Sequence, residues 1–130
     1  MYLLDSSVWI ALFRIDDSHH ARALEVMVRV GETPIRLPYG VILETLTNLT
    51  YKSSKEHANR FVEFVRGNPQ IIHDAPSATH DMAVFFAEST RISFVDALLK
   101  DVALRENVEL VTFDEELLKL VTRAHSSSSS

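Results

Sequence analysis

Four acidic residues occupy positions where a carboxylate is costly unless it has a task. Asp5 ends the apolar run YLLD, and Asp114 ends the apolar run ELVTFD. Asp96 and Glu44 lie inside the apolar helical patterns SFVDALLKDVALRE and YGVILETLTNL. A carboxylate in apolar surroundings loses its hydration, which a hydrogen bond or a bound cation must replace. Carboxylates without cysteine form the all-oxygen ligand set that suits Mg²⁺ or Mn²⁺ rather than Zn²⁺.

Each of these residues also has a purely structural interpretation. Asp5 and Asp114 each precede a helical pattern and suit the N-cap position. Ser93 and Asp96 fit the S-x-x-D capping box, in which the acid accepts a hydrogen bond from a free backbone N–H. Glu44 suits the solvent-facing side of its helix. Taken singly, the structural interpretations are favoured, but four such acids at one edge of a fold favour a single site.

Short apolar runs alternate with amphipathic helical patterns along the chain. Strands are predicted at 2–5, 34–38, 70–74 and 108–114, with 121–124 as a candidate last strand. Helices are predicted at 8–13, 16–31, 39–52, 54–67, 77–89, 93–106 and 115–120. This order predicts an α/β fold with a mostly parallel central sheet of about four to five strands, flanked by helices.

The predicted fold brings the four acids to one edge of the sheet. Ligands of open parallel sheets bind beyond the carboxyl ends of the strands. Asp5 and Asp114 stand at the carboxyl ends of two predicted strands, and Glu44 and Asp96 lie near the starts of two helices. Because four carboxylates repel one another strongly at short range, a divalent cation is their natural compensation.

Two helical patterns carry specific expectations about burial. In the helix at 16–31, the apolar stripe Ala21, Leu24, Met27 and Val28 is expected to face the core. In the helix at 77–89, the expected inward residues are Ala78, Met82, Phe85 and Phe86. Both stripes have the spacing of an amphipathic helix that packs on a sheet.

Composition restricts the class of protein. A chain of 130 residues, 46% of them hydrophobic, is expected to form one globular domain over 1–125. The serines at 126–130 are expected to be a disordered tail or an addition from cloning. The lack of cysteine excludes disulfides and suits the cytoplasm. No apolar run suits a membrane span, no secretory signal is recognisable, and the net charge of -5 argues against a broadly basic nucleic-acid coat.

Three segments resemble the PIN-domain family. YLLDSSVWIALF is similar to the family's opening strand and helix, and LPYGVILETLTNL is similar to the segment with its helical glutamate. ISFVDALLKDVALRENVELVTFDEELLK resembles the family's most specific region, an aspartate in a helix followed by a strand that ends in T-F-D. The resemblance covers 2 to about 121 in order, and the size is similar to VapC-type toxins of toxin–antitoxin pairs.

The resemblance implies a metal-dependent ribonuclease with a quartet of acidic residues. The quartet carries over to Asp5, Glu44, Asp96 and Asp114 as catalytic residues and ligands of one or two Mg²⁺ or Mn²⁺ ions. Such ions would bind the scissile phosphate and activate the attacking water. The expected partners are an RNA substrate, a cognate antitoxin and a second copy of the chain, with no membrane.

The resemblance assigns supporting roles to further residues. The hydroxyls of Ser7 and Thr112 are expected to orient the carboxylates by hydrogen bonds. Asp101 is an alternative fourth acid, because some family members place that acid one turn further along the helix. Arg14 and Arg91 are candidate contacts to RNA phosphates.

Two other functions remain open at this point. One is a catalytically silent PIN-fold scaffold that binds RNA or a protein partner, which would normally have lost part of the acidic quartet. The other is a DNA-directed nuclease of related fold, which would normally carry more acids and extra helices than a chain of this length holds.

Overall fold

The computed structural model describes residues 1–75 and 77–128. In chain order its elements are β1 (Tyr2–Leu4), α1 (Ser6–Phe13), α2 (His20–Val30), β2 (Ile35–Leu37), α3 (Tyr39–Lys52), α4 (Lys55–Val65), β3 (Ile71–His73), α5 (Ala78–Ala87), α6 (Phe94–Arg105), β4 (Glu109–Val111) and α7 (Glu115–Ser128). Each predicted strand from 2 to 114 and each predicted helix has a counterpart, with ends that differ by a few residues. The α/β fold is therefore confirmed.

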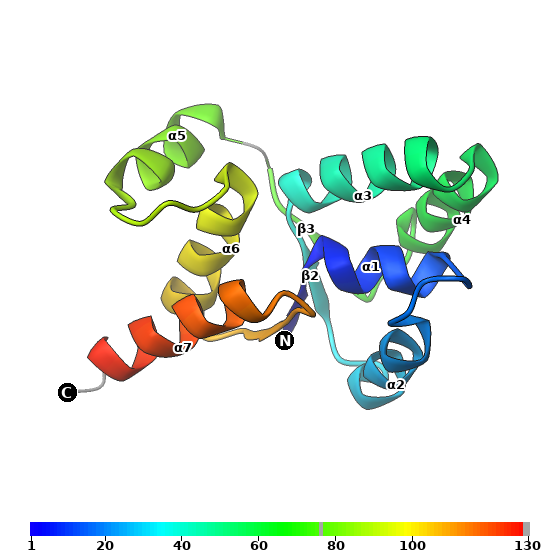
Figure 1. Ribbon diagram of the computed structural model, residues 1–130, viewed down its shortest axis with the longest axis horizontal. Helices are drawn as coiled ribbons and strands as arrows, with labels where there is room; N and C mark the ends of the chain where they lie inside the picture. The colour runs from blue at the N-terminus through cyan, green and yellow to red at the C-terminus, as the bar shows by residue number, and fades with distance from the viewer. Residues whose placement is uncertain (76, 129–130) are drawn as a thin grey trace.

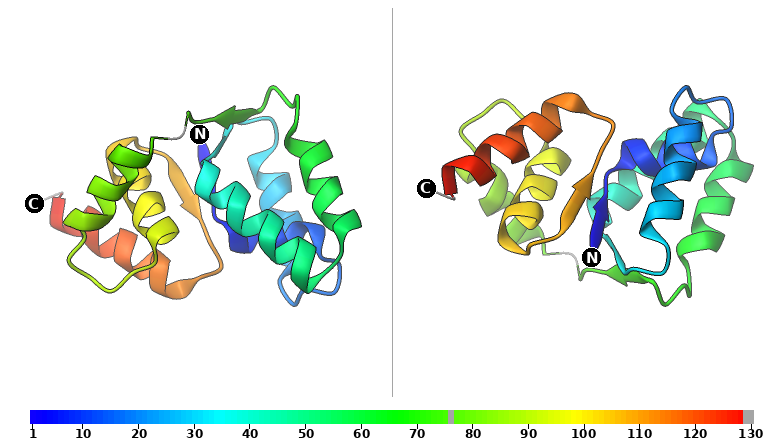
Figure 2. Two further views of the ribbon diagram at one scale, coloured as in Figure 1. Left: turned by 90° about the horizontal axis from the view of Figure 1, so that it is seen from above. Right: turned by 90° about the horizontal axis from the view of Figure 1, so that it is seen from below.

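The described strands form one parallel sheet in the order β3-β2-β1-β4. The helices α1 to α4 lie on one side of the sheet and α5 to α7 on the other (Figures 1 and 2). The chain first builds outward from β1 through β2 to β3, and then returns to the opposite side of β1 with β4. The strand order thus reverses between β1 and β4, and this is where open α/β sheets bind ligands.

Apolar side chains from the two central strands and the helices around them form the core. Leu3, Leu4 and Ile35 are fully buried, as expected for short parallel strands covered on both faces. Trp9 of α1 is also fully buried and packs edge-on against Phe61 of α4, with the ring centroids 5.5 Å apart. Trp9 thus belongs to the core, and its aromatic contacts fix α1 against α4.

The last helix differs from the prediction. Residues 121–124 form no strand, because α7 continues as one helix through them to Ser128. Leu117 and Val121 are one helical turn apart and are both buried, so packing of this face outweighs the strand preference of β-branched residues. The expectation for the serine tail falls in part on 129–130, which lie outside the described residues.

The face of α2 that is buried against the core also differs from the prediction. Leu24 and Val28 are exposed, while Ala23, Val26 and Val30 are buried. This helix carries two overlapping apolar stripes of the same period, so periodicity alone does not decide which one faces the core. Small Ala23 lies on the buried side in the core, and α2 packs on α1.

Helix α5 shows the largest departure from the expected burial. None of its ten residues, all of them described, is buried, and Met82 and Phe86 are 60% and 92% exposed. The helix contacts only the neighbouring α6 extensively, and its end is held there by an ion pair of 2.8 Å between Glu88 and Lys100. The Lys100 ammonium and the Thr90 hydroxyl donate to Glu88 and lower the pKa of its carboxyl to about 2. An apolar helix is therefore anchored at the periphery instead of packing on the sheet.

Within the described residues, no helix is both long enough and apolar enough to cross a lipid bilayer.

Candidate active site

Asp5 lies at the carboxyl end of β1 and is the centre of a hydrogen-bond network. Its side chain is 4% exposed and caps α1, because Oδ1 accepts from the Ser6 backbone N–H at 2.6 Å. Its other oxygen, Oδ2, accepts from the hydroxyls of Ser7 at 3.0 Å and Thr112 at 2.7 Å. A buried carboxylate with this many donors keeps a fixed orientation.

The two hydroxyls also connect the loops after β1 and β4. The Ser7 hydroxyl accepts from the Phe113 N–H at 3.1 Å, and the Thr112 hydroxyl accepts from the Asp114 N–H at 2.9 Å. Each hydroxyl therefore donates to Asp5 and accepts from the loop that carries Asp114. This arrangement ties two strand ends together at the point where the strand order reverses.

Glu44 reaches the same edge from α3. The Ser6 hydroxyl donates to Glu44 Oε1 at 2.9 Å and lies 3.3 Å from Asp5 Oδ1. Burial raises the pKa of the Glu44 carboxyl, and the Asp5 charge raises it further, while the Ser6 hydrogen bond lowers it. Glu44 therefore faces the interior of the site and not solvent alone.

Burial and the charges of the other three acids raise the pKa of Asp96. Burial is the main cause that raises the pKa of the Asp96 carboxyl to about 6, and the charges of Asp5 and Asp114 come next. Glu44 adds a smaller effect in the same direction, and a hydrogen bond with Ser93 opposes them. Carboxylates influence one another in this way only at short range. Asp5, Asp114 and Glu44, which come from distant parts of the chain, therefore lie near enough to Asp96 for their charges to act on it.

Asp114 contributes to the site while it caps α7. Its Oδ1 accepts from the backbone N–H groups of Glu116 at 3.0 Å and Leu117 at 3.3 Å. Asp5 caps α1 in the same manner, and Ser93 caps α6 beside Asp96. The capping interpretation is confirmed for Asp5 and Asp114. It is compatible with a role in a site, because a cap at the carboxyl edge of the sheet directs its carboxylate toward that edge.

The donor chemistry of this edge fits a hard divalent cation. Four carboxylates supply oxygen ligands, and their mutual repulsion, expressed in the raised pKa of Asp96, is what a cation would relieve. Among the described residues, however, no three acidic or histidine side chains already stand close enough to share one ion. Binding an ion would therefore require a change of side-chain conformation. Asp5 is held by the Ser6 N–H and by the Ser7 and Thr112 hydroxyls, whereas Glu44 accepts from the Ser6 hydroxyl.

A comparison with protein families agrees with this arrangement. The family model described as the PIN domain matches residues 2–122 of the chain. The chain belongs to the PIN-domain family. This membership confirms the family resemblance seen in the sequence, and the match spans all four acids of the site.

One solved structure has a closely similar PIN fold. The crystal structure of the Mycobacterium tuberculosis toxin VapC20, described as cleaving the sarcin-ricin loop, superposes with a TM-score of 0.78 and 19% sequence identity. The similarity covers 92% of this chain and 95% of that chain. At this identity it shows a shared fold. No curated protein sequence matches the chain significantly.

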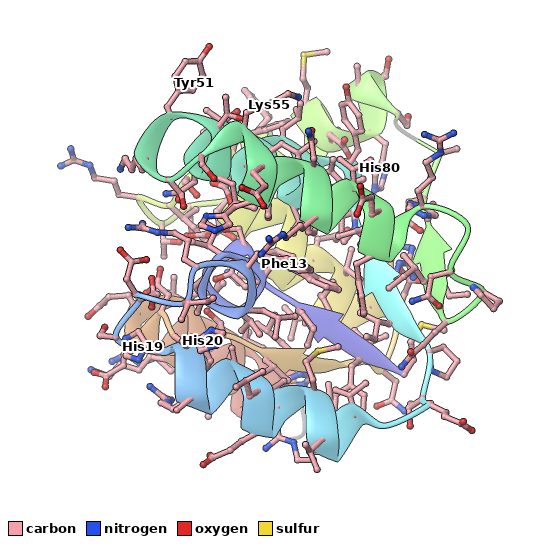
Figure 3. The ribbon with its side chains drawn as sticks, turned by 90° about the vertical axis from the view of Figure 1, so that its right-hand side faces the viewer. Phe13, His19, His20, Tyr51, Lys55 and His80 are labelled. Atoms are coloured by element: carbon pink, nitrogen blue, oxygen red, sulfur yellow. The ribbon has the colours of Figure 1, made fainter. Side chains whose placement is uncertain are left out.

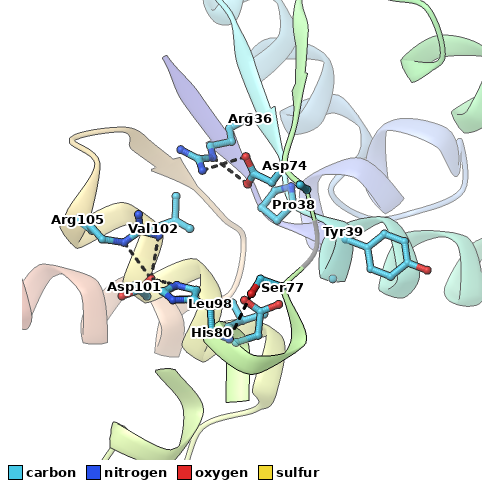
Figure 4. Close-up of a pocket in the computed structure, with 13 residues that line it drawn as sticks. Arg36, Pro38, Tyr39, Asp74, Ser77, His80, Leu98, Asp101, Val102 and Arg105 are labelled. Atoms are coloured by element: carbon cyan, nitrogen blue, oxygen red, sulfur yellow. Dashed lines mark hydrogen bonds and ion pairs between the residues drawn. The ribbon is translucent and has the colours of Figure 1, made fainter. Parts of the chain in front are cut away.

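Asp101 lies apart from the acidic site of this PIN domain. It pairs with Arg105 at 3.1 Å and lies 3.8 Å from His80 of α5. Figure 4 shows these three residues at a cavity of about 290 Å³, which is also lined by Arg36 and Asp74. Five residues along a helix turn a side chain by more than a third of a circle, so Asp101 and Asp96 face different sides of α6.

The candidate RNA contacts Arg14 and Arg91 lie outside the hydrogen-bond network around Asp5, and Arg14 is at the opposite end of α1 from that residue. Arg14 follows α1 and lies 3.8 Å from Asp16, while Arg91 is exposed in the segment before α6. Sequence reasoning missed Ser6, which joins Asp5 to Glu44. The only signal for Ser6 was its place between Asp5 and Ser7, where any small N-terminal helix residue would fit.

Proposed function

We propose that this PIN domain is an endoribonuclease that depends on Mg²⁺ or Mn²⁺. The observation that carries the proposal is that Ser6 links the Asp5 and Glu44 carboxylates at the carboxyl edge of the sheet. At the same edge, burial and the charges of Asp5, Asp114 and Glu44 raise the pKa of Asp96. Helix caps do not need to lie close to one another, and the repulsion between close carboxylates lowers the stability of the fold. A site that binds a divalent cation, and through it a phosphate, does require neighbouring carboxylates.

The side chains have distinct tasks in this proposal. Asp5, Asp96 and Asp114 would hold one or two ions, and Glu44 would be a further ligand or orient the attacking water. Ser7 and Thr112 keep the Asp5 carboxylate in one orientation through their hydrogen bonds of 3.0 and 2.7 Å. The chemistry that Mg²⁺ or Mn²⁺ supplies in such sites is polarisation of the phosphate and activation of water.

The similarity to VapC20 supports a toxin of a toxin–antitoxin pair. VapC20 is described as a toxin that cleaves the sarcin-ricin loop, and we extend RNA cleavage, but not that particular target, to this chain. An antitoxin protein and a cytoplasmic location follow from the same proposal. A silent scaffold is less well supported, because the chain carries all four acids of the proposed quartet, Asp5, Glu44, Asp96 and Asp114.

The proposal is tested by incubating the purified chain with a mixed pool of RNA. We expect cleavage in Mn²⁺ or Mg²⁺ and none after EDTA is added, because carboxylates without an ion repel the phosphate. Single-stranded and duplex DNA are included in parallel. Cleavage of DNA alone would support the related DNA nuclease, and metal-independent cleavage of RNA would contradict the proposed role of the quartet.

We also propose that the chain forms a homodimer through α5. Neighbouring exposed apolar side chains mark protein interfaces. On α5 and the start of α6 the exposed apolar side chains are Met82, Phe85, Phe86 and Phe94, and the rings of Phe85 and Phe94 are in contact. The predicted result is a dimer in analytical ultracentrifugation that Phe86→Lys converts to a monomer. Val28→Lys is the matched control, because Val28 is 83% exposed on the distant α2. A monomeric wild type would contradict this proposal.

A further inference from the structure

An arginine is held over an aromatic ring beside the acidic site. The guanidinium carbon of Arg22, in the first turn of α2, lies 4.5 Å from the centre of the Phe113 ring. His19 lies against the same ring, with the ring centres 5.1 Å apart, and Arg22 Nη1 is 3.2 Å from His19 Nδ1. Figure 3 shows His19 and His20 where the chain enters α2. These three residues, His19, Arg22 and Phe113, are called the arginine stack below.

The backbone places the arginine stack next to the carboxylates. Phe113 stands between Thr112, which donates to Asp5, and Asp114. Its N–H donates to the Ser7 hydroxyl, which itself donates to the same oxygen of Asp5. The backbone of Phe113 is therefore two hydrogen bonds from the central carboxylate, and the Arg22 guanidinium lies over the Phe113 ring. Beyond it lies a groove of about 540 Å³ between α2 and β4. Its lining includes the cations Arg22 and Arg29, the ring of Phe113 and the carboxylates Glu25 and Glu109.

The charge of Arg22 is free to bind an anion. Arg36, Arg60 and Arg105 each form an ion pair with one or more carboxylates. Among the described residues, Arg22 has no carboxylate within ion-pair distance, and its recorded contacts are a ring and an imidazole. Arg22 is also exposed. A stacked guanidinium keeps its outward N–H groups available and loses little rotamer freedom when it binds phosphate.

Binding of a polyanion such as RNA near the acidic site requires a cationic side chain. The chain carries a net charge of -5, and the four acids add local negative charge where RNA would have to approach. Ions bound by the acids would attract the scissile phosphate, but they would not hold the flanking strand. Cationic side chains bind flanking phosphates and fix the register of a nucleic acid.

We propose that Arg22, held by Phe113 and His19, binds an RNA phosphate that flanks the scissile bond. The inference rests on the proposed ribonuclease function and adds a substrate-binding residue on the α2 side of that site. The strand would then pass along the groove between α2 and β4. The alternative is that the arginine stack has a structural role alone and packs α2 against the loop after β4. Loss of Arg22 would then lower the stability of the protein and would leave the salt dependence of RNA binding unchanged.

The test measures how RNA binding depends on salt. The parent is Asp96→Asn, which we expect not to cleave, and the probe is a fluorescent single-stranded RNA of mixed sequence in constant Mg²⁺. Adding Arg22→Gln should weaken binding about ten-fold and lower the slope of log K against log salt by about 0.7. Arg22→Lys should keep the slope, because the charge remains. Arg60→Gln, on α4, makes the same change of net charge and should leave both values unaltered.

Separate outcomes distinguish this inference from the proposed function. An equal slope for Arg22→Gln and Arg60→Gln, with cleavage by the wild type, would overturn the role of Arg22 and leave the ribonuclease intact. A wild type that does not cleave, with a slope that depends on Arg22, would overturn the ribonuclease and keep the phosphate contact. A wild type that does not cleave, together with a parent that binds no RNA, would overturn both.

Discussion

Asp96→Asn is expected to abolish metal-dependent RNA cleavage and to stabilise the metal-free protein. The substitution keeps the size of the side chain but removes the charge on which the three other acids act. Loss of an ion ligand should lower the cleavage rate by at least about 100-fold. Mutation of residues that merely support a metal ligand already lowers metal affinity or activity by about 10–100-fold. The rate is measured on the RNA pool in Mn²⁺, and the melting temperature is measured in EDTA.

The sign of the stability change follows from the raised pKa of Asp96. Its folded pKa of about 6 lies above the ordinary value of 3.8, so the folded state holds a proton that the unfolded chain has released between these two values. Stability of the metal-free protein therefore falls as pH rises through this window and stays lower above it. Because Asp96 is partly exposed, we expect a penalty of only about 1 kcal/mol, or about 2–4 °C.

Asp101→Asn is the matched control for this prediction. It lies on the same helix and undergoes the same chemical change, but its carboxylate pairs with Arg105 outside the acidic site. We expect full cleavage from this variant and no gain of stability. Loss of cleavage in Asp101→Asn alone would move the fourth acid to that position and contradict the assignment of Asp96.

The sequence predicted the position of the acidic edge because chain order and strand ends determine it. Asp5 and Asp114 each follow an apolar run, and parallel strands bring such positions to one edge whatever the details of packing. Their roles as helix caps were also predictable, since capping depends on neighbours in sequence. These local rules do not say that Asp5 is the centre of the network. That follows from hydrogen bonds to Thr112, which is 107 residues away in the chain.

The features that the sequence did not predict depend on tertiary packing, that is, on which faces of the helices pack against other elements. Helix α5 has the spacing of a core helix, but the layer that would cover the sheet is formed by α6 and α7, so Phe86 remains exposed. The stripe of α2 was ambiguous because both of its candidate faces are apolar. The arginine stack joins Arg22 to Phe113 across the fold, and no spacing rule relates two such residues.

Asp5→Ala is expected to destabilise the protein, in contrast to Asp96→Asn. The change removes the cap of α1 and leaves the Ser7 and Thr112 hydroxyls without their acceptor. A lost cap costs about 1 kcal/mol and buried groups without partners cost about 1–3 kcal/mol. Relief of repulsion at Asp96 offsets part of this, so a net loss of about 2–3 kcal/mol is expected in urea unfolding without metal.

Asp114→Ala separates the network from a simple cap. Among the described residues, the Asp114 side chain accepts only from the first turn of α7, so its loss should cost about 1 kcal/mol. If Asp5→Ala costs no more than Asp114→Ala, the hydroxyl network contributes nothing to stability, and the orientation of Asp5 would need another explanation. A larger cost for Asp5 would mean that one carboxylate both holds two strand ends together and faces the site. Its orientation would then be fixed by the fold before any ion binds.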